Sequence, residues 1–154
     1  MLADRGLVPA LRAVGRRGPR PVQVTGRRIG RYPPEIESAV YYCCLEALQN
    51  ATKHGGPAAH IAARLTVEDG ELRLEVSDDG PGFDVAAIRS GDGLRNMADR
   101  LGAVHGRLTI NSSPGKGTVI SGVVPVDDAA PLAQLPPDGA PSRRAARWAA
   151  WRAR

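Results

Sequence analysis

The feature that most restricts the possible folds is a long amphipathic segment, residues 34–54, followed directly by two alternating runs. The segment begins with a proline, which suits the first turn of a helix, and stops before a Gly-Gly-Pro sequence. Residues 58–67 and 71–77 then alternate apolar and polar side chains, as strands with one buried face do. The dipeptide Asp69-Gly70 between the two runs is a strong hairpin signal. The sequence therefore predicts a long helix that precedes an antiparallel pair of strands.

The rest of the chain supplies further elements of both kinds. The same rules predict helices over 7–17 and 94–105, a short strand at 22–24, a loop over 26–34, and a hairpin of residues 107–111 and 118–124. Helices and strands in this order indicate an α/β two-layer sandwich, with helices on one face of a mostly antiparallel sheet.

Length and composition favour one cytoplasmic domain with tails. The chain has 154 residues and 42% hydrophobic residues, which is typical of a soluble globular protein. No apolar run approaches the roughly 18 residues that would span a bilayer, and no signal peptide is visible. The two cysteines, Cys43 and Cys44, are adjacent, which suits neither a disulfide nor a metal site. We therefore interpret them as core thiols in a reducing compartment.

Charge divides the chain into three parts. Residues 1–31 contain eight arginines and one acidic residue, and residues 127–154 contain five arginines in an Ala- and Pro-rich context, whereas acidic residues outnumber basic ones over 32–126. We expect 127–141 to be a disordered linker. The last residues, 142–154, are predicted to form a basic helix that carries Trp148 and Trp151, either as a solvated tail or as a contact to an anionic membrane or partner.

A polar stripe follows one side of the long predicted helix. Glu46, Asn50 and Lys53 recur at helical spacing. An amide oxygen is a neutral ligand suited to Mg²⁺, a lysine suits phosphate, and the carboxylate could accept a proton or hold a metal-bound water. The alternative is an ordinary solvent-facing side of an amphipathic helix.

Two glycine-rich turns follow, and each suits part of a nucleotide. Residues 78–82 (DDGPG) stand at a strand end, where Asp78 could accept a hydrogen bond from the exocyclic amine of adenine; the alternative is a plain tight turn. Gly91-Asp92-Gly93 opens a helix, whose free N–H groups and dipole suit a phosphate. Neither a Walker loop nor a Rossmann turn has this spacing.

Taken together, these segments resemble the ATP-binding domain shared by histidine kinases, gyrase-type topoisomerases, Hsp90 chaperones and mismatch-repair ATPases. Residues 46–53 resemble its N box, 78–82 its G1 box and 91–97 its G2 box, and Thr118 resembles a threonine that lies near adenine. Within this group, the sequence is most similar to sensor histidine kinases of the nitrate-sensor type. The segments that carry this similarity are YYCCLEALQNATKH, DDGPGF and GLRNMADRLGAVHGRLTINSSPGKGT. Residues 4–24 also resemble the stretch that joins dimerisation helices to this domain.

The resemblance implies a Bergerat fold, a mixed sheet under helices, with Mg-ATP held beneath a short lid. It makes 32–126 the ATP-binding catalytic domain and 1–31 a remnant of the linker and dimerisation region. The implied catalytic residues are Glu46, Asn50 and Lys53, with Asn50 on Mg²⁺ and Glu46 acting through a metal-bound water or on the acceptor. The implied ATP-binding residues are Asn50, Lys53, His54, Asp78, Gly80, Gly82, Gly91, Gly93, Leu94, Arg95 and Thr118.

The phospho-acceptor of such kinases has no counterpart here. His54, His60 and His105 are followed by glycine, isoleucine and glycine, whereas the family's acceptor histidine precedes an acidic residue. The chain is thus expected to transfer the γ-phosphate of ATP to a histidine on a missing or separate dimerisation domain, with a response regulator downstream and no nucleic acid as partner. The alternatives are an anti-sigma-factor-type serine kinase, an ATP hydrolase of the same fold, and a non-catalytic nucleotide-binding module.

Overall fold

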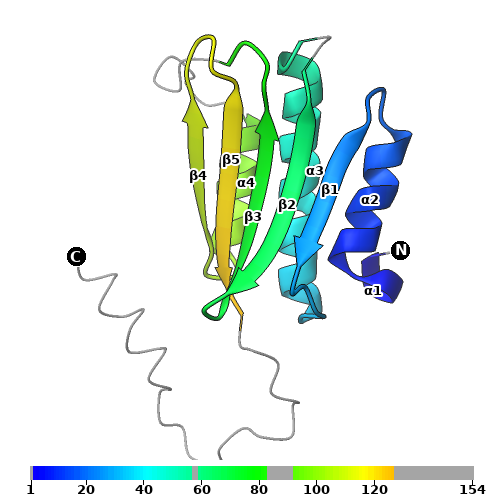
Figure 1. Cartoon of the computed structure of the whole chain (residues 1–154). Helices are drawn as coiled ribbons and strands as arrows, with labels where there is room; N and C mark the ends of the chain where they lie inside the picture. The colour runs from blue at the N-terminus through cyan, green and yellow to red at the C-terminus, as the bar shows by residue number, and fades with distance from the viewer. Residues whose placement is uncertain (1, 57–58, 83–91, 127–154) are drawn as a thin grey trace, which may run out of the picture.

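The structure, a computed structural model, describes residues 2–56, 59–82 and 92–126. Its elements in chain order are α1 (Leu2–Arg5), α2 (Leu7–Arg17), β1 (Val22–Arg27), α3 (Pro34–His54), β2 (Ile61–Glu68), β3 (Glu71–Asp78), α4 (Asp92–Gly102), β4 (Arg107–Ser112) and β5 (Thr118–Pro125). The strands form one sheet in the order β1-β2-β3-β5-β4, in which β1 and β2 are parallel and the other neighbours antiparallel. Helices α3 and α4 lie on the same face of the sheet, and α2 lies beside β1 (Figure 1). The predicted two-layer sandwich with a mixed sheet is confirmed.

The helix α3 has the bounds that its sequence predicts. Pro34 occupies its first turn, and the acidic Glu35 and Glu37 stand at its positive end. Its last turn closes where the N–H of Gly55 donates to the carbonyl of Ala51 at 2.8 Å. The side of α3 that faces the sheet is fully buried, with Val40, Cys43, Cys44, Ala47 and Ala51 in the core. This burial fixes the rotation of α3 about its axis.

The sheet side of the core comes from alternate residues of the central strands. Ala63 of β2, Val76 of β3 and Ile120 of β5 are buried cross-strand partners in one row. The turn between β2 and β3 places Asp69 (φ 54°) and Gly70 (φ 72°) in the left-handed region, as the predicted Asp-Gly hairpin requires. The described helices leave the opposite face of the sheet uncovered (Figure 1).

Several predicted element boundaries are wrong. Strand β1 continues through Gly26 and Arg27, which were expected in a loop, because the parallel ladder to β2 runs to the pair Arg27–Thr66. The third long helix, α4, begins at Asp92 rather than 94 and ends at Gly102 rather than 105. Its end is set by His105, which is left-handed at φ 62°, and by the Gly106 N–H, which donates to the Leu101 carbonyl at 2.7 Å. In addition, β2 begins at Ile61, and α1 was not predicted.

The N-terminal elements pack into the same core as the rest. Leu7 and Leu11 of α2 and Val24 of β1 belong to the hydrophobic cluster that also contains the buried residues of α3 and the central strands. Arg31 strengthens the connection, since its guanidinium pairs with buried Glu37 (Nη2–Oε1 3.1 Å) and donates to the Ala3 carbonyl at 2.8 Å. The assignment of 1–31 as a linker remnant stays a prediction, and the predicted linker and basic helix of 127–154 lie outside the described residues.

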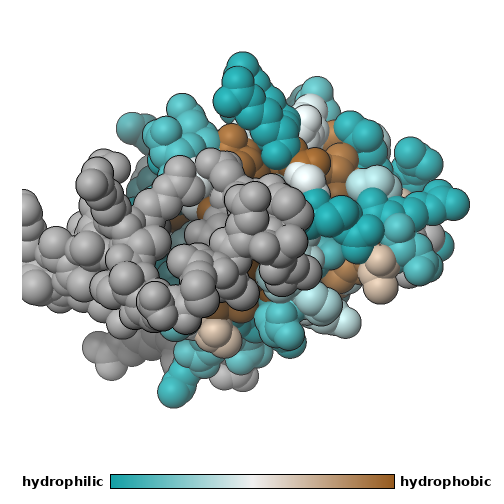
Figure 2. Space-filling model, turned by 90° about the horizontal axis from the view of Figure 1, so that it is seen from below, coloured by the Kyte–Doolittle hydropathy of each residue, from teal (hydrophilic) through white to brown (hydrophobic). Residues whose placement is uncertain are grey.

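The two ends of the sheet are formed by different parts of the chain. The end shown in Figure 2, where α3 begins and β2 turns into β3, presents hydrophilic side chains with hydrophobic ones between them. The other end gathers the last turn of α3, the end of β3 and the start of β5. Within the described residues, no helix is long and apolar enough to cross a membrane.

Candidate functional site

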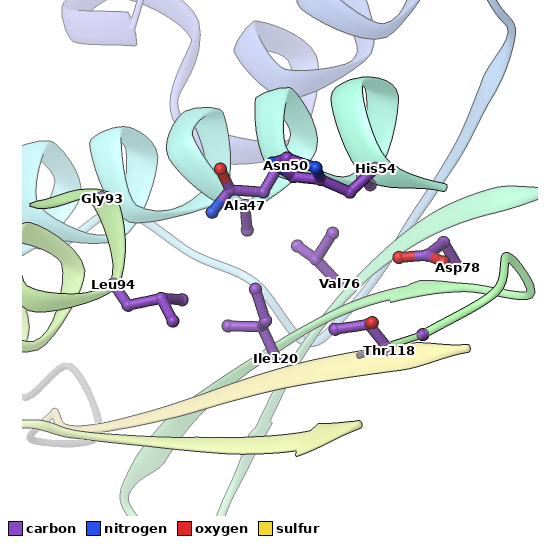
Figure 3. A pocket seen from close by; sticks show the side chains of 11 residues that line it. Ala47, Asn50, His54, Val76, Asp78, Gly93, Leu94, Thr118 and Ile120 are labelled. Carbon is purple, nitrogen blue, oxygen red and sulfur yellow. The ribbon is translucent and has the colours of Figure 1, made fainter. Parts of the chain in front are cut away.

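A cavity of about 300 Å³ opens between α3 and the sheet, at the end where α3 and β3 finish (Figure 3). It is lined by Ala47, Asn50, Ala51, His54, Val76, Asp78, Gly82, Gly93, Leu94, Thr118 and Ile120. Asn50 and Asp78, predicted to face one cavity, both line it: Asn50 lies on α3, and Asp78 lies across the cavity at the end of β3. Segments that are far apart in the sequence therefore form one site.

The sheet contributes two rows of side chains to this cavity. Val76 of β3 pairs with Ile120 of β5, and two residues further on Asp78 pairs with Thr118. Because strand side chains alternate with period two, both pairs point to the same face of the sheet. The result is an apolar floor with a polar edge, and Leu94 of α4 extends the floor (Figure 3). Such a surface suits a flat aromatic ring with hydrogen-bonding groups at one side.

Local hydrogen bonds fix the polar edge. The Gly80 N–H donates to Asp78 Oδ1 at 2.9 Å, which orients that carboxylate at the end of its strand. Thr118 is buried, and its Oγ1 lies 2.8 Å from Ser112 Oγ, which in turn donates to the Gly117 carbonyl at 3.0 Å. Since that bond uses the Ser112 hydrogen, the Thr118 hydroxyl donates to Ser112 and keeps its lone pairs as acceptors.

Close packing against backbone requires the glycines of the turn after β3. Gly80 lies against the backbone of Gly55, and Gly82, at φ 65°, lies against the Ser113 carbonyl, so neither position has room for a Cβ. Gly93 differs, because it lies against the end of the flexible Glu46 side chain, which can move aside for a Cβ. The Gly115 N–H also donates to the Pro81 carbonyl at 2.6 Å, which ties the β4–β5 turn to the glycine turn after β3.

The predicted site residues divide into two groups. Asn50, His54, Asp78, Gly82, Gly93, Leu94 and Thr118 line the cavity, whereas Glu46, Lys53, Gly80 and Arg95 do not. Glu46 is half-buried beside Gly93, and Lys53 and Arg95 are exposed on α3 and α4. Gly91 lies outside the described residues. The roles of these residues toward phosphate stay predictions.

Sequence reasoning missed the apolar lining and one hydroxyl. Ala47 lies three residues before Asn50 and Ala51 lies three residues before His54, on the same side of α3, so the helical period could have indicated them. Val76 and Ile120 could have been inferred from strand alternation only with the β3–β5 register in hand. Ser112, which holds Thr118, gave no signal in the sequence.

The side chains of the cavity suit a metal ion that takes most of its ligands from water and from the bound substrate. The described residues contain no group of three His, Cys, Asp or Glu side chains that could hold a metal ion. The Asn50 amide lines the cavity and would offer one neutral oxygen to a cation. This pattern suits Mg²⁺, which keeps several waters and binds mainly through substrate phosphates.

Comparison with known proteins agrees with the fold. Residues 35–128 match the histidine kinase-, DNA gyrase B- and HSP90-like ATPase family. The chain belongs to this family, and 35–128 is its ATP-binding domain. A histidine kinase domain from a blue-light-activated kinase of Erythrobacter litoralis shares the fold, with a TM-score of 0.62 at 22% identity over 77% of this chain and 57% of that one.

Within the family, several similar curated proteins are sensor histidine kinases. The chain is 39% identical over 104 residues to an uncharacterized sensor-like histidine kinase of Chloroflexus aurantiacus, covering 63% of this chain and 17% of the relative. It is 40% identical to the sensor histidine kinase MctS of Rhizobium johnstonii, covering 59% and 20%, and 30% identical to the kinase/phosphatase DegS of Brevibacillus brevis, covering 81% and 34%. The chain thus spans no more than about a third of the length of these relatives.

Proposed function

We propose that this chain is the ATP-binding catalytic domain of a two-component sensor histidine kinase of the nitrate-sensor type. It transfers the γ-phosphate of Mg-ATP to a histidine outside this sequence and acts in the cytoplasm. A response regulator acts downstream of that histidine. The observation that carries the proposal is the shared cavity: Asn50 and Asp78 face it from opposite walls, with an apolar floor between them.

Adenine fits the end of the cavity that Asp78 and Thr118 form. A carboxylate accepts hydrogen bonds, so Asp78 can receive the exocyclic N–H of adenine but repels the carbonyl that guanine carries at that place. Thr118 Oγ1 lies beside it as a second polar group, and Val76, Ile120 and Leu94 offer apolar contact to the ring. Selectivity for adenine therefore rests on this chain's own acceptors.

The phosphates fit the end of the cavity near the start of α4. Gly93 lines the cavity in the first turn of α4, where free N–H groups and the helix dipole attract anions. Lys53 and Arg95, both exposed, are the cations that we expect to supply positive charge to the phosphates. When bound through Asn50, Mg²⁺ would neutralise charge that develops on the transferred group. Positioning and electrostatics do most of the work in such transfers.

The three histidines of the chain have other surroundings than an acceptor needs. His54 lines the nucleotide cavity, His60 contacts Asp79, and His105 closes the end of α4 in a left-handed conformation. None precedes an acidic residue in the sequence. We therefore assign the phospho-acceptor histidine to the dimerisation domain of the kinase, which lies outside this sequence or on a separate chain.

The test has a binding step and a transfer step. Calorimetry should show ATP binding that strengthens with Mg²⁺ in the wild type, and Asn50→Ala should remove this magnesium dependence. Gln49→Ala, at the neighbouring exposed position, is the control and should keep it. Labelled ATP is then incubated with the chain and the dimerisation domain of a sensor histidine kinase. Acid-labile phosphate on that domain supports the proposal; acid-stable phosphate indicates a serine kinase instead. Magnesium dependence that survives in Asn50→Ala would contradict the site assignment.

A further inference from the structure

The turn that carries Asp78 is held from outside the cavity by the next residue, Asp79. Asp79 Oδ1 accepts the His60 N–H at 2.6 Å, and its Oδ2 lies 3.1 Å from His60 Nδ1. The Asp79 N–H also donates to the His60 carbonyl at 3.3 Å. These contacts continue the β2–β3 pairing one residue beyond Ile61–Asp78, the last pair of the ladder.

The same turn is held on its other side by the segment that follows α3. Gly80 packs on the backbone of Gly55, where any side chain would overlap. Arg20, from the connection between α2 and β1, donates to the carbonyl of Gly56. Residues 78–80 are therefore fixed between the end of α3 and the start of β2.

The two neighbouring carboxylates point in different directions. Asp78 lines the cavity, while the Asp79 side chain is 61% exposed and does not line it. Successive side chains of an extended strand end point to opposite faces, so a bond made by Asp79 sets the direction of Asp78. The hydrogen bonds from His60 lower the pKa of Asp79, which keeps it ionised and able to accept them.

From these contacts we propose that Asp79 is a positioning residue for adenine recognition, a role that rests on the function proposed above. Held by His60, Asp79 fixes the end of β3 so that the Asp78 carboxylate stands where the adenine amine arrives. Without this hold the strand end can rotate, and the hydrogen bond that distinguishes adenine from guanine weakens. The contacts to phosphate, from α4 and Asn50, do not depend on Asp79, so the change should appear in base preference.

The experiment compares ATP with GTP as competitors of a fluorescent trinitrophenyl-ATP, at fixed Mg²⁺. Asp79→Ala should lower the preference for ATP by about three- to tenfold, the value of one well-placed hydrogen bond. Asp79→Asn should keep most of the preference, because its amide oxygen can still accept the His60 N–H. Glu75→Ala removes another exposed carboxylate from β3 and should leave the preference unchanged.

Two results would overturn the inference: an unchanged preference in Asp79→Ala, or an equal loss of affinity for both nucleotides, which indicates general loosening. If circular dichroism shows Asp79→Ala unfolded, His60→Ala and Asp79→Asn decide together. Both keep the backbone bond and lose the ring contact to the carboxylate, so both must show the same small fall in preference below the wild type, and no fall in either overturns the inference. A wild type that ignores ATP would instead remove the proposed function, and this role with it.

Discussion

Gly93, in the first turn of α4, lies directly against the Glu46 carboxylate of α3, so that a Cβ on residue 93 would overlap Oε1. The two residues belong to the two segments that the sequence assigned to catalysis and to phosphate. Gly93 lines the cavity and Glu46 stands behind it. The packing between α3 and α4 therefore controls how the start of α4 meets the nucleotide.

Gly93→Ala should displace the Glu46 carboxylate rather than unfold the protein, because the end of a glutamate side chain is flexible. We expect stability within about 1 kcal/mol of the wild type. Mg-ATP binding should weaken by about 1 kcal/mol, or about fivefold in Kd. Calorimetry of Gly93→Ala, Glu46→Ala and the double variant should show non-additive effects. Gly102→Ala, at the other end of α4 with open space around it, is the control; strict additivity would mean that the contact does not matter.

Asp78→Asn tests the adenine acceptor itself. Replacing one carboxylate oxygen by an amide NH₂ removes an acceptor, and ATP binding should lose about 1–3 kcal/mol. GTP should lose less than ATP or gain, since the new NH₂ can donate to the guanine carbonyl. Competition binding with both nucleotides measures the difference. Equal Kd values for ATP in the variant and the wild type would show that Asp78 does not contact the base.

The sequence predicted those elements whose ends carry local signals. Helix α3 was placed correctly because a proline, first-turn acids and a glycine pair mark its ends. Likewise, the Asp-Gly turn marked the β2–β3 hairpin. The N-terminal half of β1 was recognised, but its continuation through Gly26 was not, since glycine usually breaks a strand and only the ladder to β2 retains it.

The site was harder to predict where it depends on contacts between distant segments. Of the stripe Glu46, Asn50 and Lys53, only Asn50 lines the cavity, because the positions of α4 and the sheet decide which part of the helix faces it. The contact of Asp79 with His60 joins residues that are 19 apart in sequence, and no local pattern encodes it. Such pairings become visible only once the register of the strands is known.

The two cysteines should be unreactive in the folded protein. Burial raises the pKa of Cys43 to about 12 and that of Cys44 further, so the thiolate that would react is scarce at neutral pH. A disulfide reagent should therefore titrate both thiols in denaturant and neither in buffer. Rapid labelling of native protein would contradict the buried positions that the structure gives them.

The same raised pKa predicts a loss of stability at alkaline pH. Because the folded pKa of Cys43 lies above the unfolded value near 9.0, its contribution is complete below that pH and is lost as pH rises toward 12. Urea unfolding of the wild type and Cys43→Ala at rising pH should show a smaller alkaline loss in the variant. Parallel curves for the two proteins would contradict this prediction.

Acid should remove the contribution of Asp79. His60, through its backbone N–H and then its ring, lowers the pKa of Asp79 below its usual 3.8. A lowered folded pKa means that the stabilisation is present above the unfolded pKa and disappears as pH falls through the folded one. Asp79→Asn should therefore have a lower Tm than the wild type near neutral pH, and the difference should shrink and vanish as pH falls through the folded pKa of Asp79. A Tm difference between the two proteins that persists in acid would mean that the side chain's packing, and not its charge, causes the effect.

Leu11→Ala tests whether α2 is part of the folded domain. Leu11 is fully buried and packs in the same cluster as Val40 of α3 and Leu65 of β2. Truncating a leucine at such a position typically costs about 2–5 kcal/mol, through lost burial and the cavity left behind. Urea unfolding should show this loss as one cooperative transition of the whole domain, with nucleotide binding lost along the same curve.

Arg16→Ala, on the exposed side of the same helix, is the matched control and should stay within about 0.5 kcal/mol of the wild type. If Leu11→Ala proved equally mild, α2 would be an appendage whose packing adds little to the core. If instead it lowered the cooperativity and produced a separate early transition, the N-terminal elements would unfold on their own. A single shifted transition is what the shared cluster predicts, because β1 and α2 then cannot leave without exposing the partner strand β2.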